Sequence, residues 1–247
     1  MLENIFAQPI YVENVGNVYP IKLKDYDKFI KCSNVLYISK KYYQENEYPL
    51  LFLLFMTVEN LGFTHKQLIN DLEALFSLVT HNEFYFIQDE NYIRFEHVYR
   101  DENGIHKKYI DADNYEKIRF AIMKQNLMYE QKVYKTERMR KWAEKAMEAK
   151  QRKAPKITLE DMVSTVSVYC GKHYWDLENY TIYQIYFDFY RLRKKVEHNS
   201  GVHFLCAGAK DLELRDFAES LDLYHNPYDD LFVSADKLSG LNKAIGK

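Results

Sequence analysis

The chain has 247 residues, a net charge of −2 and a composition that is 47% apolar, 16% aromatic and 28% charged. That apolar fraction can fill at least one hydrophobic core, which excludes a fully disordered protein. The balanced charge excludes a protein that is basic over its whole surface, and three cysteines without a CxxC pair argue against a disulfide framework.

The start of the chain and its most apolar segment predict no export or membrane insertion. Glu3 precedes any apolar run and no basic region comes before it, so we expect no signal peptide. The most apolar stretch, residues 49–58, is about half of the roughly 20 residues that a bilayer span needs. We expect this stretch to be buried in a core, and the protein to be soluble, intracellular and without a membrane partner.

The first third of the chain predicts a hairpin followed by helices. Residues 8–23 form two short apolar runs around Gly16-Asn17, which predicts a β-hairpin with its turn at that dipeptide. Pro49 is suited to open a helix over 49–61, and Gly62 to end it. Thr64 and Gln67 have the spacing of a capping box, and the apolar residues that follow to Val79 have helical spacing.

The middle of the chain changes to a β pattern and then to a long helix. Residues 83–110 contain three strand-like runs separated by turn residues, which predicts an antiparallel meander. A helix is expected from Asp113, with no helix breaker before Pro155. Its second half, 132–156, holds ten basic residues against three acidic ones and only a thin apolar stripe. This predicts a solvated connecting helix at a domain boundary.

The last third predicts only helices. One is expected from Thr158 to Cys170, and a second from Asn179 or Thr181 to a stop at 199–201. A short apolar helix and an acidic helix over 211–221 should follow. The fold class is therefore α+β and mostly helical, with these expected parts: an N-terminal α+β domain (1–125), a basic connecting helix (126–156), an all-α C-terminal domain (157–225) and a weakly structured tail (226–247).

The sequence contains none of the common catalytic or cofactor motifs. HExxH, GxSxG, GxGxxG and P-loop patterns are absent. Cys170 lies close to Lys172 and His173, yet a thiol at the end of an apolar helix is more often structural. The pair His97 and His106, and the group His198, His203 and Cys206, fit ordinary histidines better than a zinc site, which needs three or four converging ligands. We expect no enzyme, no cofactor and no metal.

The basic segment 132–156 admits a nucleic-acid interpretation. Lys and Arg neutralise phosphates, and Tyr134 and Trp142 could stack on bases. Glutamates four residues away from several of the cations favour the alternative, a merely solvated helix face. The residues to test are Arg138, Arg140, Lys141 and Lys145.

Residues 157–221 resemble segments of tail morphogenesis proteins from phages of Firmicutes. The likeness rests on Trp175-Asp176-Leu177, on the run from Tyr180 to Arg191, and on Cys206-Ala207-Gly208. The opening, from Pro9-Ile10-Tyr11-Val12 through Tyr19-Pro20-Ile21, resembles the start of phage tail assembly chaperones, where a small hairpin leads into helices. The meander and the long basic helix depart from that pattern, which leaves the partner and the oligomeric arrangement open.

The resemblance implies a non-enzymatic protein of the host cytoplasm that coats or escorts the tape measure protein during tail assembly, with self-association as a further expectation. Independently of it, Tyr, Trp and Arg are the usual anchors of protein interfaces. The interaction candidates are Trp175, Tyr180, Tyr183, Tyr186, Tyr190 and Arg193. For Trp175, Tyr183 and Tyr186, the alternative is that the rings belong to the core.

Two other functions remain open at this point. A nucleic-acid-binding module would act through the basic helix and lose affinity steeply with salt. A structural virion subunit, such as a baseplate or connector component, would stay in the finished particle.

Overall fold

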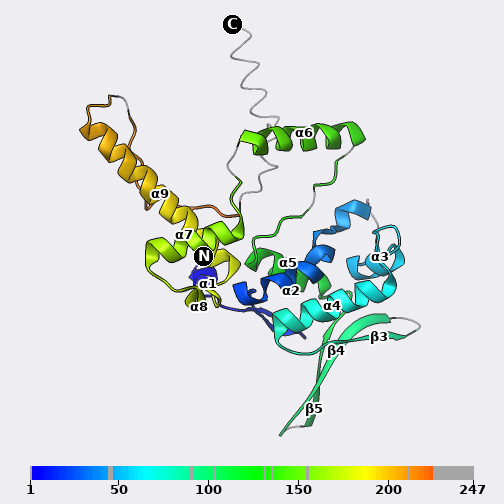
Figure 1. Ribbon diagram of the computed structural model, residues 1–247. Helices are drawn as coiled ribbons and strands as arrows, with labels where there is room; N and C mark the ends of the chain where they lie inside the picture. Colours follow the sequence, from blue (N-terminus) through cyan, green and yellow to red (C-terminus); the bar gives the residue numbers. More distant parts are fainter. Residues whose placement is uncertain are drawn as a thin grey trace. The chain divides into compact units, whose positions relative to one another are not determined.

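A computed structural model describes residues 2–43, 47–89, 92–102, 104–130, 132–134, 136–153, 156–210 and 212–224. Helices dominate, and the strands form two small antiparallel sheets, which confirms the predicted mostly helical α+β class (Figure 1). The chain forms two compact units, residues 1–131 with 159–221, and residues 132–158 with 222–247. Each unit is described by itself.

The first unit begins with α1 (Leu2–Ile5) and the hairpin of β1 (Ile10–Val12) and β2 (Gly16–Val18). The hairpin is confirmed, but the prediction that its turn lies at Gly16-Asn17 was wrong. Gly16 is the first residue of β2 and pairs with Val12, while Asn14 has a φ of 65° in the turn itself. The side chain of Val15 is fully buried, and this anchor places the turn before Gly16.

Short helices follow the hairpin and build one side of the core. They are η1 (Leu23–Asp25), α2 (Tyr26–Cys32), η2 (Ser33–Tyr37), η3 (Lys40–Tyr43), α3 (Leu50–Met56) and α4 (His65–Thr80). The capping box of Thr64 and Gln67 is present, and residues 50, 51, 53–55 and 58 are buried as expected. The helix predicted over 49–61 ends earlier, at Met56. Thr57 turns its hydroxyl back to the Leu53 carbonyl at 2.7 Å and leads into a turn.

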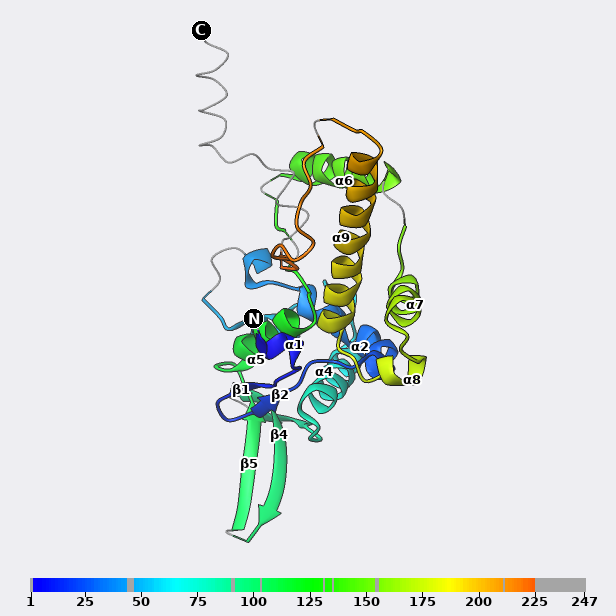
Figure 2. The same cartoon turned by 90° about the vertical axis from the view of Figure 1, so that its left-hand side faces the viewer.

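The predicted meander is present as β3 (Tyr85–Asp89), β4 (Tyr92–Asp101) and β5 (Gly104–Ile110). Phe95 and Ile110 pair near the base of the sheet, where both are fully buried in the core shared with α4. β3 pairs only with residues 92–96 of β4. The distal part of β4 and β5 extends away from the helices as a two-stranded arm (Figure 2).

The continuous helix predicted from Asp113 to Pro155 was wrong. α5 (Tyr115–Gln125) ends where Asn126 leaves the helix. The side-chain Nδ2 of Asn126 donates to the Ile122 carbonyl at 2.8 Å, and its Oδ1 accepts a hydrogen bond from the Ile21 backbone N–H at 3.0 Å. Leu127 then takes a left-handed φ of 54°. The buried tie to Ile21 therefore ends the helix, and α6 (Glu137–Lys153) is a separate helix in the second unit.

The helices α7 (Leu159–Cys170), α8 (Tyr174–Leu177) and α9 (Ile182–Cys206) belong to the first unit. These helices therefore do not form the separate C-terminal domain expected at 157–225, but pack in the same unit as the N-terminal residues. The physical reason is a set of hydrogen bonds to the N-terminal residues. The Leu23 amide donates to Tyr180, the Lys24 amide to Glu178, and Gln184 to the Ile5 carbonyl, at 2.7–3.0 Å.

The end of α9 differs from the prediction. The helix does not stop at 199–201 but runs on to Cys206, so the expected short apolar helix is its last part. The acidic helix predicted over 211–221 is absent from the described residues 212–221. These residues run back along α9, where Arg191 and His198 bind their backbone carbonyls. A Cβ on Gly201 would lie 2.9 Å from the Leu214 side chain. Gly201 therefore leaves room for the returning chain, and does not end the helix.

No helix in the part of the chain that the structure describes is both long and apolar enough to cross a membrane. The tail expected over 226–247 lies outside the described residues.

Candidate functional site

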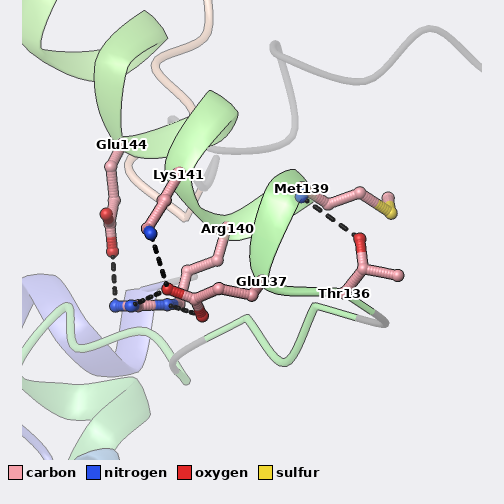
Figure 3. A network of polar contacts seen from close by, with 6 residues as sticks. All are labelled: Thr136, Glu137, Met139, Arg140, Lys141 and Glu144. Atoms are coloured by element: carbon pink, nitrogen blue, oxygen red, sulfur yellow. Dashed lines mark hydrogen bonds and ion pairs between the residues drawn. The ribbon is translucent and has the colours of Figure 1, made fainter.

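The four basic candidates on α6 are all exposed, but two of them are already paired. Arg140 contacts Glu137 at 2.6 Å and Glu144 at 2.9 Å, and Lys141 lies 3.7 Å from Glu137 (Figure 3). The hydrogen bonds from Arg140 lower the pKa of Glu137, and the same contacts raise the pKa of Arg140. This network stabilises the helix by itself and leaves Arg140 with little free donor capacity for a phosphate.

Three of the four basic candidates on α6 lie on one face of the helix. Arg138, Lys141 and Lys145 are spaced by three and four residues and therefore point to the same side of the helix. Such a stripe can attract phosphates in a salt-dependent way. A row of acids, Glu137, Glu144 and Glu148, runs directly beside it and lowers the local positive charge.

The aromatic residues predicted for contact on α9 are mostly packed inside the first unit. Tyr183 is buried and stacks on Phe187 with ring centroids 5.9 Å apart. Tyr186 is half-buried, and burial raises the pKa of its hydroxyl. Tyr190 is half-buried against Phe189. Arg193 is exposed and lies 3.9 Å from Glu197 on the same helix. For Tyr183, the alternative interpretation as a core residue is the one that fits.

Trp175 differs from these residues because it is exposed. It lies in α8, next to the end of α7, where four large apolar side chains are 58% to 75% exposed: Val168, Tyr169, Tyr174 and Trp175. We call these four residues the aromatic corner. Four exposed large apolar side chains within eight residues of the chain are more than the single scattered ones that a surface facing only water normally carries.

Local structure explains why the aromatic corner is rigid. Gly171 ends α7 with a left-handed φ of 62°, and α8 begins two residues after Lys172. Asp176 accepts the His173 backbone N–H at 3.3 Å, and the His173 ring stacks on Trp175 with centroids 4.2 Å apart. Leu177, fully buried, anchors α8 in the core. The indole is therefore held on a fixed turn and does not sit on a loose loop.

Polar contacts tie the turn between α7 and α8 to the segment that leads into α9. The Lys172 ammonium donates to the Tyr180 hydroxyl, which raises the pKa of Lys172. The Ser167 hydroxyl donates to the Lys172 carbonyl at 2.6 Å. Asp188 of α9 is half-buried, and burial raises its pKa. Tyr180, predicted to bind a partner, is thus engaged inside the protein.

A cavity of about 640 Å³ lies beside the first turn of α9. Its walls include Tyr19, which stacks on His81, and Thr181 and Gln184, which cap α9. Asp25 on the same wall pairs with Lys28. These five polar side chains are therefore used in structural contacts.

The histidines do not assemble a metal site in the described residues. No group of three or more His, Cys, Asp or Glu side chains there has a metal-binding arrangement. His97 and His106 do not face each other. In the β4–β5 register His106 is opposite Tyr99, and both histidine rings stack on the Tyr99 ring, with centroids 5.8 Å (His97) and 5.4 Å (His106) away; His106 also contacts Asp101 at 3.0 Å.

Comparison with known proteins places these features in a phage context. Residues 149–222 match a family described as the YomV second domain. This span contains α7 to α9 and the whole aromatic corner. The chain is 25% identical over 226 residues to the SPbeta prophage-derived uncharacterized protein YomV of Bacillus subtilis (strain 168), covering 88% of this chain and 87% of that protein.

That similarity supports a phage origin. It extends along almost the full length of both chains, so it involves both compact units. No solved structure matches the chain.

Sequence reasoning found Trp175 but missed the other members of the aromatic corner. Val168 and Tyr169 belong to the amphipathic repeat of α7, where an apolar residue ordinarily predicts burial. The available signal was Gly171, which ends the helix directly after them and turns the chain before their side chains can be covered.

Proposed function

We propose that this protein is a non-enzymatic phage protein that acts in tail assembly by binding another protein through the aromatic corner. The observation that carries the proposal is the exposure of Val168 and Tyr169 at the end of α7 and of Tyr174 and Trp175 in α8, directly after it. Rigid, exposed aromatic side chains are the typical anchors of protein interfaces because they bury a large area at low entropic cost.

Two further points support the proposal. The similarity to a prophage-derived protein favours a phage process. The resemblance of residues 157–221 to tail morphogenesis proteins favours tail assembly in the host cytoplasm, with the tape measure protein as partner. The aromatic corner lies within those residues. A partner with a long apolar helical surface would suit four apolar side chains without a free charge among them.

Replacing Trp175 with alanine is expected to reduce capture of the partner at least tenfold, because a central aromatic anchor contributes about 2 kcal/mol or more to binding. The measurement is a tagged pulldown from nuclease-treated, phage-producing cells, with the tape measure protein quantified by mass spectrometry. Phe120→Ala is the matched control, since Phe120 of α5 is 67% exposed against 66% for Trp175. Both variants should have the same midpoint of urea unfolding as the wild-type protein.

Other results would contradict the proposal. Equal recovery of the tape measure protein with Trp175→Ala and Phe120→Ala would remove the aromatic corner from the interface. In a parallel pulldown without nuclease, recovery of nucleic acid that is lost when Arg138 and Lys145 are both changed to Glu would favour the basic face of α6. Detection of the protein in purified virions would favour a structural subunit over an assembly chaperone.

A further inference from the structure

The two-stranded arm formed by the distal halves of β4 and β5 has an unpaired strand edge along β4. β3 pairs with β4 only as far as Glu96, so residues 97–101 have β5 on one side and no strand on the other in the described chain. Val98 and Ile105 on this arm are 53% and 71% exposed. Isolated two-stranded ribbons are marginal in water, and open edges template further pairing.

Two hydrogen bonds establish which backbone groups of β4 face the open edge. The backbone N–H of Phe86 donates to the Glu73 side chain, and the backbone N–H of Tyr109 donates to the Asn14 carbonyl. The backbone N–H groups of both residues therefore point away from β4. Their partners in register are Phe95 and Glu96. Because backbone direction alternates along a strand, residues 97, 99 and 101 face β5, and Val98 and Arg100 present their N–H and C=O groups outward.

The outer edge of β5 is protected against pairing, whereas that of β4 is not. β5 carries His106, Lys107 and Lys108 in succession, and a second copy aligned antiparallel would bring these bases together. Lysines on an edge strand are a usual guard against association. At the base of the arm, the Tyr109 amide is also already bonded to Asn14. Residues 97–101 of β4 hold one cation and one anion, Arg100 and Asp101, and no lysine.

We propose that two copies of this chain pair through the free edge of β4, antiparallel and centred on Tyr99. In this register the backbone of Val98 exchanges two N–H···O bonds with that of Arg100 in the other copy. By symmetry, Arg100 exchanges two such bonds with Val98 of the other copy. Tyr99 lies opposite its own copy, and His97 lies opposite Asp101. A hollow of about 430 Å³, lined by His97, Val98 and Tyr85, lies beside the start of β3 and leaves space next to this edge for the partner strand.

Other registers are less favourable. Centring on Arg100 would place like charges opposite each other, which is destabilising. Centring on Val98 would bring the partner strand against Glu96, whose edge is occupied by β3. A contact of this size is small, so we expect a weak, reversible dimer.

A disulfide trap tests the register. Directly opposed residues that do not exchange hydrogen bonds have Cα atoms about 4.5 Å apart, within the range of about 4.4–6.8 Å for a disulfide. The background carries Cys170→Ser and Cys206→Ser, because these two thiols are exposed, whereas Cys32 is buried. Tyr99→Cys in this background should form a covalent dimer under mild oxidation at high protein concentration.

Ile105→Cys is the matched control on the same arm. Its two copies would be three strand spacings apart, about 14 Å, and should not crosslink. Adding Val98→Pro to Tyr99→Cys removes an outward N–H in each copy without touching the β4–β5 ladder, and should lower the crosslinked fraction about tenfold. Circular dichroism checks that the fold is kept.

Equal crosslinking of Tyr99→Cys and Ile105→Cys, or none from either, would overturn the proposal. So would a Tyr99→Cys yield that Val98→Pro does not reduce in a folded protein. These results are independent of partner capture by Trp175, so the arm and the aromatic corner are tested separately.

Discussion

Replacing Phe76 with alanine is expected to lower the free energy of unfolding by about 4 kcal/mol. Phe76 lies in α4 and is fully buried. Its ring contacts those of Phe84, Phe95 and Tyr115, with centroids 6.3, 5.1 and 6.4 Å away. These partners come from the segment before β3, from β4 and from α5, so the deletion opens a cavity where three parts of the first unit meet. Urea denaturation followed by far-UV circular dichroism measures the loss.

The control for this substitution is Phe120→Ala, which removes an equally large ring from an exposed position on α5. It should change the free energy of unfolding by no more than about 0.5 kcal/mol. A loss below about 1 kcal/mol for Phe76→Ala would mean that the aromatic contacts described above do not form the core.

Replacing Arg119 with methionine is expected to cost about 3 kcal/mol, because it leaves buried polar groups without a partner. Arg119 lies in α5 with its side chain 5% exposed. Its Nε donates to the Leu36 carbonyl and its Nη1 to Glu130, both at 2.9 Å. Lys41→Met is the matched control, since Lys41 binds the other oxygen of Glu130 at 3.1 Å from an exposed position. It should cost less than about 1 kcal/mol.

The same ion pair predicts a pH dependence. Burial alone would raise the pKa of Glu130, but hydrogen bonds from Arg119 and Lys41 outweigh it and lower that pKa below the usual 4.5. A carboxylate with a lowered folded-state pKa stabilises fully above its unfolded pKa, and this contribution disappears as the pH falls through the folded value. The acid limb of stability should therefore be shallower in Arg119→Met than in the wild type. Parallel acid limbs in the two proteins would contradict the assignment.

Short-range signals were sufficient for much of the fold. The capping box at Thr64 and Gln67 requires only residues three apart, and it was predicted correctly. The meander was predictable because turn residues and strand-forming runs alternate within 28 residues, 83–110. In both cases the interactions that decide the structure lie close together in the sequence.

Long-range contacts explain the errors. α5 ends at Asn126 because of a buried hydrogen bond to Ile21, 105 residues earlier. Gly201 was interpreted as a helix stop, yet its lack of a side chain serves a close approach by Leu214. The sequence alone does not show which distant residue will contact a glycine or an asparagine. The predictions at these two positions therefore rested on local propensity and were wrong.

The candidate site shows the same contrast between what short-range signals predict and what long-range contacts decide. Trp175 was named from residue type, while its exposure depends on how α8 is anchored by Leu177 and turned by Gly171. Tyr183 carries the same kind of side chain and is buried, because its helix packs on the N-terminal residues through Gln184 and Ile5. Side-chain chemistry suggested both residues, and only packing distinguished them.

The most direct test of the central claim is photocrosslinking from the aromatic corner in phage-producing cells. A benzoylphenylalanine residue replaces Trp175 in one variant and Phe120 in the other, and crosslinked proteins are identified by mass spectrometry after irradiation. We expect the probe at 175 to crosslink to the tape measure protein, and the probe at 120 not to do so. No crosslink to a phage tail protein from position 175, or equal crosslinking from both positions, would contradict the proposed function.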